Sequence, residues 1–372
     1  MRTCSAYDDA QSLSATSEVI TTPSSFVNAP PASNKEKPSS SRATFRQANR
    51  VVALFKDIKS GQYELQPWTK FQLQPGEYDE IERLVLNDTD TSLWGFINNK
   101  IRYDFDGDRN QLILRMPTAI HERFVTLVKQ DIDAQLKSLA TSTTLEESVT
   151  HFAQRVCNLG SADIKFPNDT SQKPPQNSPD GTYYYRDAKW PGVILEVSYS
   201  EKRKDLEKLA DRYILLSKAN VRVVVGLDIE YQHPKQKKTK AGSRDAVLSV
   251  WRPEIIQNEG KMQLIAAQKI KDQPFRDAQG DPTSSQGLSL LLSEFAHPEI
   301  SQAITDHDQS INISTDKLCE YLNDAEEMMQ RVLDNSLIEM NLPAGVEIKF
   351  RENTPPEVLD EEDERKFRMK EK

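Results

Sequence analysis

The sequence predicts an α/β protein in which a mixed central sheet is flanked by helices. Apolar residues recur at helical spacing from Thr118 to Leu139, which is the pattern of an amphipathic helix. Two apolar runs, Val193–Val197 and Val221–Asp228, have the composition of buried strands. A second helical pattern, Glu201–Ser217, separates these two runs. Strands and helices that alternate in this way are typical of the α/β class.

Composition sets the limits of the fold. The 372 residues are 37% hydrophobic and carry a net charge of -9. A chain of this length and composition can bury one apolar core, but it is too polar to be packed tightly throughout. Residues 1–44 are rich in Ser, Thr, Ala and Pro, and residues 353–372 are strongly charged, so both are expected to be disordered. No apolar run approaches the roughly 18 residues of a membrane-spanning helix, so no membrane partner is expected. Cys4, Cys157 and Cys319 are too few and scattered for a disulfide framework or a zinc site, which favours an intracellular location in the nucleus or cytoplasm.

The first half of the chain is expected to contain four helices and a hairpin. Residues 45–58 and 75–86 are predicted to be short helices, and Leu93–Phe105 with Gln111–Met116 to be the two strands of a hairpin. The acidic turn between these strands resembles a calcium loop only superficially, because Arg115 stands where a bidentate Glu is needed.

Two helix starts are marked by capping residues. Thr118 is a plausible N-cap for the amphipathic helix that follows it. Thr144 and Glu147 have the spacing of a capping box, which predicts a second helix that extends through Val156.

The second half of the chain adds strands and a terminal helix. The predicted strands are Ala162–Phe166, Thr182–Tyr185, Ala246–Trp251 and Met262–Ile270. Leu288–Phe295 is expected to be a short amphipathic element, and Thr315–Asn335 a helix. This last helix either docks on the core or pairs with a second copy of the chain, which would give a homodimer.

Two carboxylates on neighbouring short segments are the first candidate for a functional site. Pro179 and Gly181 bracket Asp180 and place it at the mouth of a strand, while Glu196 interrupts an otherwise apolar strand. A buried, unpaired carboxylate costs several kcal/mol, so Glu196 needs a cation or a hydrogen-bonded partner. The alternatives are a divalent metal ion shared with Asp180, with the carboxylates within about 5 Å of each other, and an ion pair with a basic side chain of the next helix.

The residues around this acid pair resemble a known family. Pro-Asp is followed by a strand ending in Glu-Val-x-Ser, by a helix with spaced Asp, Lys and Tyr, and by an apolar strand. The matching residues are Pro179, Asp180, Glu196, Val197, Ser198, Ser200, Asp205, Lys208, Tyr213 and Val221–Asp228. This pattern resembles the PD-(D/E)xK nuclease superfamily, in particular the restriction endonuclease family common in cyanobacteria. The resemblance extends weakly over residues 94–139 and 287–295.

The resemblance implies a restriction-endonuclease-like fold and a chemistry. It implies hydrolysis of phosphodiester bonds in nucleic acid, DNA above all, with Mg²⁺ or Mn²⁺ as cofactor. Asp180, Glu196 and the main-chain carbonyl of Val197 would hold the metal ion. It also divides the chain into a nuclease-like domain over residues 45–300 and a helical extension over residues 301–352, between the terminal arm and tail.

The catalytic lysine is where the sequence departs from the pattern. The superfamily's lysine two residues after the Glu is here Ser198, as it is in the resembling family, which carries its lysine on the following helix. That helical position falls on Leu209, so Lys208 is one residue out of register, whereas Lys202 lies near the apolar stripe of the helix. Either lysine, Lys208 by resemblance or Lys202 by helix geometry, is a candidate for orienting the attacking water, and both are also explained as residues of a solvated helix face.

Further polar residues are candidates for contact with the site or with nucleic acid. His121 and Glu122, at the start of a helix, are positioned to approach the acids, although polar residues at a helix start are more often simply solvated. Residues 183–244 contain fourteen Lys and Arg against eight Asp and Glu, which suits a polyanionic partner. The densest basic cluster is expected to contact phosphates, to act as a nuclear import signal, or to be a solvated hairpin loop; it comprises Lys235, Lys237, Lys238, Lys240 and Arg244.

Two functions follow from these observations. The first is a metal-dependent nuclease, in which replacing either acid by Ala abolishes cleavage and leaves stability unchanged or raised, because carboxylates in a water-filled site repel each other. The alternative is a catalytically inactive module of the same fold that binds nucleic acid or a protein partner.

Overall fold

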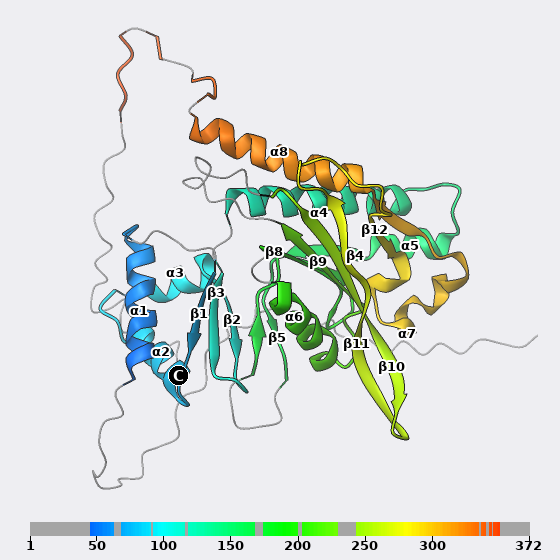
Figure 1. Ribbon diagram of the computed structural model, residues 1–372, viewed down its shortest axis with the longest axis horizontal. Helices are drawn as coiled ribbons and strands as arrows, with labels where there is room; N and C mark the ends of the chain where they lie inside the picture. Colours follow the sequence, from blue (N-terminus) through cyan, green and yellow to red (C-terminus); the bar gives the residue numbers. More distant parts are fainter. Residues whose placement is uncertain are drawn as a thin grey trace, which may run out of the picture. The chain divides into compact units, whose positions relative to one another are not determined.

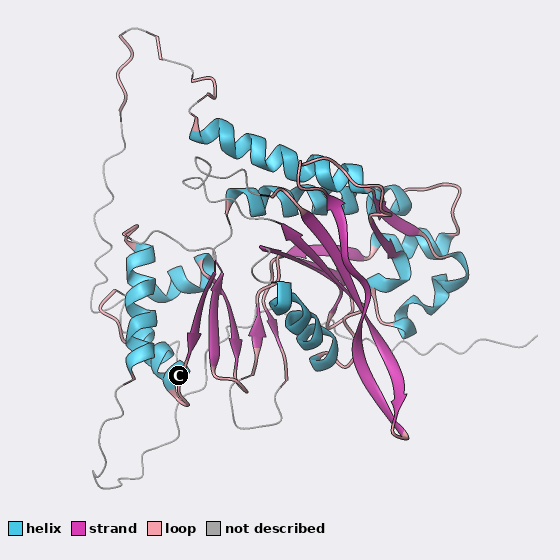
Figure 2. Ribbon diagram, in the orientation of Figure 1, coloured by secondary structure: helices cyan, strands magenta, loops and turns pink. Residues whose placement is uncertain are grey.

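The structure is a computed structural model that describes residues 45–62, 68–90, 92–115, 118–167, 174–199, 203–229, 243–334, 336–339, 342–343 and 345–349 (Figure 2). The arm over residues 1–44 and the tail over residues 353–372 lie outside the described residues. Lys202 and the four lysines between positions 235 and 240 also lie outside them. The described part of the chain contains no helix that is both long and apolar enough to cross a membrane.

A six-stranded mixed sheet forms the centre of the fold (Figure 1). Its strands follow the order β11-β10-β9-β8-β7-β4, and β8 and β9 are parallel whereas the other neighbours are antiparallel. The strands are β4 (Val156–Gly160), β7 (Gly181–Tyr185), β8 (Pro191–Tyr199), β9 (Val223–Ile229), β10 (Ala246–Asn258) and β11 (Lys261–Arg276). The predicted α/β class with a mixed sheet is therefore confirmed.

Helices cover both faces of this sheet. Along β8, Val193 and Leu195 pack in one apolar cluster with α4 (Ala119–Ala140) and α8 (Thr315–Leu333), whereas Ile194 packs in another with α6 (Arg203–Leu216). Successive side chains of a strand point to opposite faces, so α4 and α6 lie on opposite sides of the sheet.

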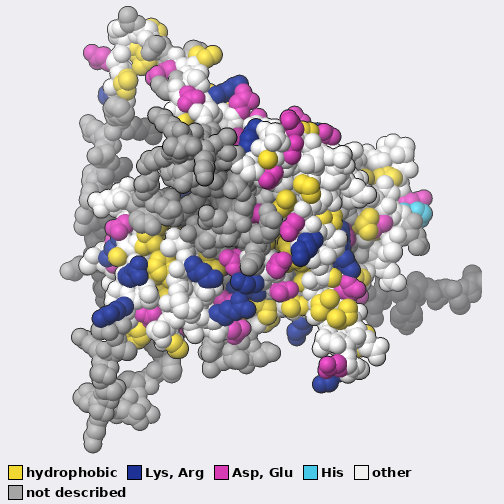
Figure 3. Space-filling model, in the orientation of Figure 1, with side chains coloured by type: hydrophobic (Ala, Val, Ile, Leu, Met, Phe, Trp, Pro, Cys, Tyr) yellow, Lys and Arg dark blue, Asp and Glu magenta, His cyan; other side chains and the backbone are white. Residues whose placement is uncertain are grey.

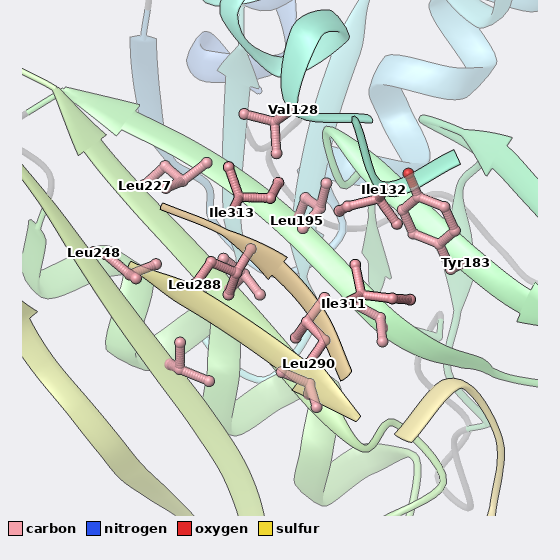
Figure 4. Close-up of a cluster of buried hydrophobic side chains, with 14 of the residues drawn as sticks. Val128, Ile132, Tyr183, Leu195, Leu227, Leu248, Leu288, Leu290, Ile311 and Ile313 are labelled. Atoms are coloured by element: carbon pink, nitrogen blue, oxygen red, sulfur yellow. The ribbon is translucent and has the colours of Figure 1, made fainter. Parts of the chain in front are cut away.

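The larger apolar cluster contains a small second sheet (Figure 4). Strand β12 (Leu288–Leu291) pairs with β13 (Ser310–Ile313), and its side chains Leu288 and Leu290 belong to the same apolar cluster as Leu195 and Leu248 of the central sheet. Short helices flank this pair, namely α5 (Glu147–Gln154), η2 (Leu292–Phe295), α7 (Pro298–Ser301) and η3 (Gln302–His307). Because β13 and α8 share this cluster with α4, the apolar residues between Ile304 and Ala325 belong to the same core as the central sheet.

The N-terminal part of the described chain contributes most of a third sheet, which has its own apolar cluster. Its strand order is β1-β3-β2-β6-β5. These strands are β1 (Trp68–Gln72), β2 (Arg102–Asp106), β3 (Gln111–Arg115), β5 (Ile164–Lys165) and β6 (Gln176–Asn177). Three helices pack against it, α1 (Arg46–Lys59), α2 (Glu77–Leu86) and α3 (Leu93–Lys100), so the two helices expected at the start of the chain are confirmed.

Strands β10 and β11 form a ribbon with exposed apolar side chains. Ile255 is 65% exposed and Met262 is 70% exposed. Figure 3 shows hydrophobic side chains gathered along this ribbon. Both strands are longer than the sequence predicted, because their antiparallel pairing extends from Ala246 with Arg276 to Asn258 with Lys261 at the turn.

The prediction of residues 93–105 as a single strand of the hairpin was wrong in part. Residues 93–100 form helix α3, and only the strands β2 and β3 form the hairpin. Leu93, Ile97 and Ile101 are at most 6% exposed and are spaced four residues apart, so a helix buries all three on one side. The same spacing also falls on one face of a strand, so spacing by itself does not distinguish the two elements.

The predicted capping box was also wrong. Helix α5 begins at Glu147 with Glu146 as its N-cap, so Glu147 is the first helical residue instead of the third. The Thr144 hydroxyl lies 3.2 Å from the Ser142 hydroxyl, within a turn that precedes the helix. Val156 starts strand β4 instead of continuing the helix, because it pairs with Tyr185 of β7.

Candidate acid-pair site

The register of β7 and β8 brings Asp180 and Glu196 to neighbouring positions. Gly181 pairs with Leu195, and the Asp180 N–H donates to the Leu195 carbonyl at 3.2 Å. Continued by one residue, this antiparallel register places Asp180 opposite Glu196. Both are buried, with 3% and 1% of their surface exposed.

Asp180 accepts from donors of three separate elements. His121 Nε2 of α4 lies 3.1 Å from Oδ2, the Val197 N–H donates to the same oxygen at 2.8 Å, and Arg102 of β2 donates to Oδ1 at 3.1 Å. Burial by itself raises the pKa of Asp180, but these partners, above all His121, outweigh it and hold the pKa well below its usual range. Asp180 is therefore an ionised carboxylate inside a complete shell of donors.

Glu196 has partners on the opposite side. Arg115 Nη1 of β3 donates to its Oε2 at 2.7 Å, and the Tyr213 hydroxyl of α6 donates to its Oε1 at 2.5 Å. Burial raises the pKa of Glu196 to about 8; Arg115 opposes this shift, and the charges of Asp180 and Asp104 add to it.

Arg115 is the buried cation that joins these groups. Its guanidinium also contacts Asp104 Oδ2 at 3.1 Å and donates to the main-chain carbonyl of Ser178. Although burial lowers the pKa of Arg115, Asp104 and Glu196 outweigh it and raise the pKa well above the usual value. One guanidinium balances the charge of one carboxylate, which agrees with the raised pKa of Glu196.

The two carboxylates do not present oxygens to a common ion. All four of their oxygens already accept hydrogen bonds or ion pairs from protein donors. His121 of α4 contacts Asp180, and Tyr213 of α6 contacts Glu196, so the two carboxylates are held by different helices. Mg²⁺ needs several oxygen ligands at about 2.0–2.1 Å in octahedral geometry. Among the described residues, no group of three His, Cys, Asp or Glu side chains is arranged to hold a metal ion.

The lysine positions on α6 do not face the acids. Leu209, at the position of the resembling family's lysine, is 7% exposed and packs in the apolar cluster with Ile194. The Lys208 side chain is 51% exposed and pairs with Asp205 at 3.0 Å, one turn earlier on the same helix. Ser198, at the superfamily's lysine position, donates to Asp228 at 2.6 Å.

Lys129 is a basic residue beside the acids that the sequence did not single out. Its ammonium group donates to the main-chain carbonyl of Asp180 at 3.2 Å, and partial burial lowers its pKa. It lies two helical turns after His121 on α4, the spacing at which side chains share a face. This spacing along α4 is the sequence signal that would have identified Lys129 as a neighbour of the acids.

The arginines of the hairpin were also missed. Arg102 and Arg115 are directly opposite each other on β2 and β3. Like charges at such a position repel, so each needs acids nearby. Arg102 pairs with Asp180 and with Glu122, each at 3.1 Å. The start of α4 therefore lies at the site, which agrees with the interpretation of His121 and Glu122 from the sequence.

Arg244, predicted to contact nucleic acid, instead contacts side chains of α8. It contacts Glu326 of α8 at 2.5 Å and Asn323 at 2.9 Å, and Arg276 of β11 joins the same two side chains. Its guanidinium therefore links the central sheet to α8. The four lysines predicted to accompany it lie outside the described residues.

No protein-family model matches this chain, and no curated protein matches it either.

Proposed function

We propose that this protein is a nuclease-like module that binds nucleic acid without cleaving it. The observation that carries the proposal is the complete set of protein donors around Asp180 and Glu196. A hydrolytic site of this kind needs carboxylate oxygens available to a metal ion and a lysine directed at the attacking water. Here the oxygens are held by arginine, histidine, tyrosine and a main-chain N–H, and the helical lysine position is a buried leucine.

The order of the elements supports the nuclease-like part of the proposal. Asp180 precedes β7, Glu196 lies in β8, and α6 then leads to β9, which pairs in parallel with β8. This is the order of the sequence pattern that resembles the restriction endonuclease family. A restriction-endonuclease-like fold accounts for this order together with the mixed sheet.

The position of the basic segment supports a nucleic-acid partner. Ile229, the last residue of β9, pairs with Ala246, the first of β10. Tyr199 at the carboxyl end of β8 is paired with Ile229. In the sequence, the lysines at 235, 237, 238 and 240 fall between these two strand ends, which belong to the end of the sheet that also carries the acid pair. Lysines attract phosphates through counterion release.

A second candidate is the metal-dependent nuclease itself, with Mg²⁺ or Mn²⁺. The register that places Asp180 opposite Glu196 favours it, because two acids on adjacent strands are its basic requirement. We further propose an intracellular location, in the nucleus or cytoplasm, and a homodimer formed through α8.

Two measurements on the purified full chain separate the candidates. Fluorescence anisotropy with labelled DNA and RNA oligonucleotides is expected to show binding that weakens with salt. Replacing the four lysines at 235, 237, 238 and 240 by Ala should reduce the salt slope by about 0.7–0.9 for each of these lysines that neutralises a phosphate. Replacing Lys261, at the far tip of the ribbon, is the control and should leave the slope unchanged.

Cleavage is tested in parallel. Supercoiled plasmid and single-stranded DNA incubated with Mg²⁺ or Mn²⁺ are expected to remain intact. Cleavage by the wild type that disappears in both Asp180→Asn and Glu196→Gln would replace the binding module by the nuclease. If the wild type neither binds nor cleaves any nucleic acid, both candidates are rejected.

A further inference from the structure

A polar cavity lies directly beside the acid pair. Its volume is about 480 Å³, within the roughly 300–1,000 Å³ range of small-ligand pockets. The end of α3 and the start of β2 form one wall, the first turn of α4 a second, and the segments around β5 and β6 a third. Its polar lining includes Asn98, Lys100, Arg102, Glu122, Ser161 and Asp163.

The charges around this cavity are mostly fixed by internal partners. Arg102 is held between Asp180 and Glu122, each at 3.1 Å. Asp163 accepts from the Ser178 hydroxyl at 2.5 Å and from the Gln176 amide at 2.8 Å. These groups are oriented before any ligand enters, which lowers the entropic cost of binding.

Lys100 differs from the other charged residues of the lining. It is exposed, and no ion pair joins it to any other residue that the structure describes. A cation at the mouth of a cavity, without an acidic partner in the described part of the chain, suits an anionic ligand group. The hydroxyl, amide and carboxylate groups of the lining supply both donors and acceptors for the edge of a polar ring.

We infer that this cavity receives one unpaired nucleotide, either within a single strand or as a free mononucleotide. The inference rests on the proposed nucleic-acid binding and deepens it. Lys100 meets the phosphate, and Asn98, Ser161 and Asp163 meet the hydrogen-bonding edge of the base. A base in a duplex has this edge occupied, and its extrusion costs a few kcal/mol, so the cavity selects unpaired nucleotides.

The test compares single strands, duplexes and mononucleotides. Lys100→Glu reverses the charge at the cavity mouth, and Ser161→Phe fills the cavity. Lys261→Glu makes the same charge change outside it and serves as the control. Anisotropy titrations use a labelled 12-mer DNA as a single strand and as a duplex, and calorimetry uses a mixture of deoxynucleoside 5′-monophosphates. Thermal unfolding of each variant establishes that it is folded.

The expected result is that single-strand affinity falls by about tenfold or more in both cavity variants. Duplex affinity should change less, and the control should bind as the wild type does. Mononucleotides that bind and compete with the strand would show that the cavity recognises the nucleotide itself, whereas mononucleotides that do not bind would show that it requires the strand.

Other outcomes overturn the inference or the function separately. If the cavity variants bind single strands as the wild type does while the lysine variants at 235–240 do not, the inference fails and the proposed function stands. Equal reductions in affinity for single strand and duplex also overturn it, since Lys100 would then be a general phosphate contact. A wild type that binds neither strands nor duplexes contradicts the proposed function, and mononucleotide binding alone would then leave the cavity assignment in place.

Discussion

At the scale of single residues, the central feature is a buried ionic network in place of an open acid site. Asp104, Asp180 and Glu196 are almost fully buried, and Arg115 lies among them with 7% of its surface exposed. Buried charges are tolerated only when each is paired and hydrogen-bonded, and breaking one pair leaves an uncompensated charge. The network is therefore sensitive to the removal of any member.

Replacing Asp180 by Ala is expected to lower the free energy of unfolding by about 3–5 kcal/mol. The variant leaves His121, Arg102 and the Val197 N–H without their common acceptor. Urea denaturation measures the change. Asp187→Ala is the control: its carboxylate is 67% exposed in an ion pair with Arg155, and its removal should cost at most about 1 kcal/mol. A stability that stays level or rises in Asp180→Ala would instead indicate the water-filled acid site that the nuclease interpretation expects.

The protonation of Glu196 is expected to make stability depend on pH. Its pKa is about 8 in the folded state against 4.5 for an ordinary Glu, so between these values the folded state binds more protons than the unfolded state. The stability that this group contributes is therefore fully present below pH 4.5 and falls as pH rises towards 8, by at most about 1.4 kcal/mol per pH unit.

Urea denaturation at intervals from pH 5 to 8 measures this slope, and Glu196→Gln, which cannot ionise, should flatten it. An unchanged slope in that variant would assign the dependence to another group. Asp180 acts in the opposite direction: its lowered pKa contributes stability above pH 3.8, which is lost as the pH falls below that value.

At the scale of secondary-structure elements, the start of β8 depends on a close approach of two backbones. A Cβ built on Gly192 would lie 2.2 Å from the carbonyl carbon of Phe295 and 2.6 Å from the main-chain oxygen of Glu294. These are main-chain atoms, which cannot move away as a flexible side chain can. The contact joins β8, which carries Glu196, to the η2 helix after β12.

Gly192→Ala is expected to destabilise the protein by at least about 1–3 kcal/mol, the usual cost of an overpacked core. Gly95→Ala is the matched control, because its Cβ would meet no atom within 4 Å and it lies in α3. In a helix, Ala is favoured over Gly by roughly 0.5–1 kcal/mol, so this variant should be slightly more stable. Thermal unfolding of both variants tests this difference; equal melting temperatures would mean that η2 moves away from β8 at little cost.

At the scale of the whole molecule, ion pairs connect the N-terminal sheet to the central one, and α8 covers α4. Contacts of Arg123 with Asp324 and of Asp131 with Tyr321 show that α4 and α8 run antiparallel. Beyond Asp324, the last turns of α8 extend past the start of α4 (Figure 1). The exposed fractions there are 40% for Met328, 54% for Val332 and 51% for Leu333.

A homodimer through this end of α8 is the expected consequence. Glu327 and Arg331 lie one turn apart on it, so an antiparallel second copy places each beside its opposite charge. Size-exclusion chromatography with light scattering should give twice the mass of one chain, and Val332→Glu combined with Leu333→Glu should give the monomer without lowering the melting temperature. The same substitutions at exposed Leu86 and Leu159 are the control. A wild type that is monomeric at high concentration contradicts the dimer.

Local sequence determined most elements and the proximity of the two acids. The periodicity of apolar residues predicted α1, α2, α4, α6, α8 and the strands around the acid pair, because burial on one face fixes the spacing within each element. It was wrong at α3 and at the start of α5, where packing and a turn outweighed local signals. Asp180 and Glu196 were found because an acid in an apolar strand must have a partner.

The identity of that partner was decided by tertiary structure alone. Arg102 and Arg115 come from a hairpin far earlier in the chain, and the separations of 78 and 81 residues leave no periodic signal. Only the docking of that hairpin against β7 and β8 shows whether the carboxylates are open to an ion or closed by arginine. Charge compensation depends on distances in space, which local residue patterns do not encode.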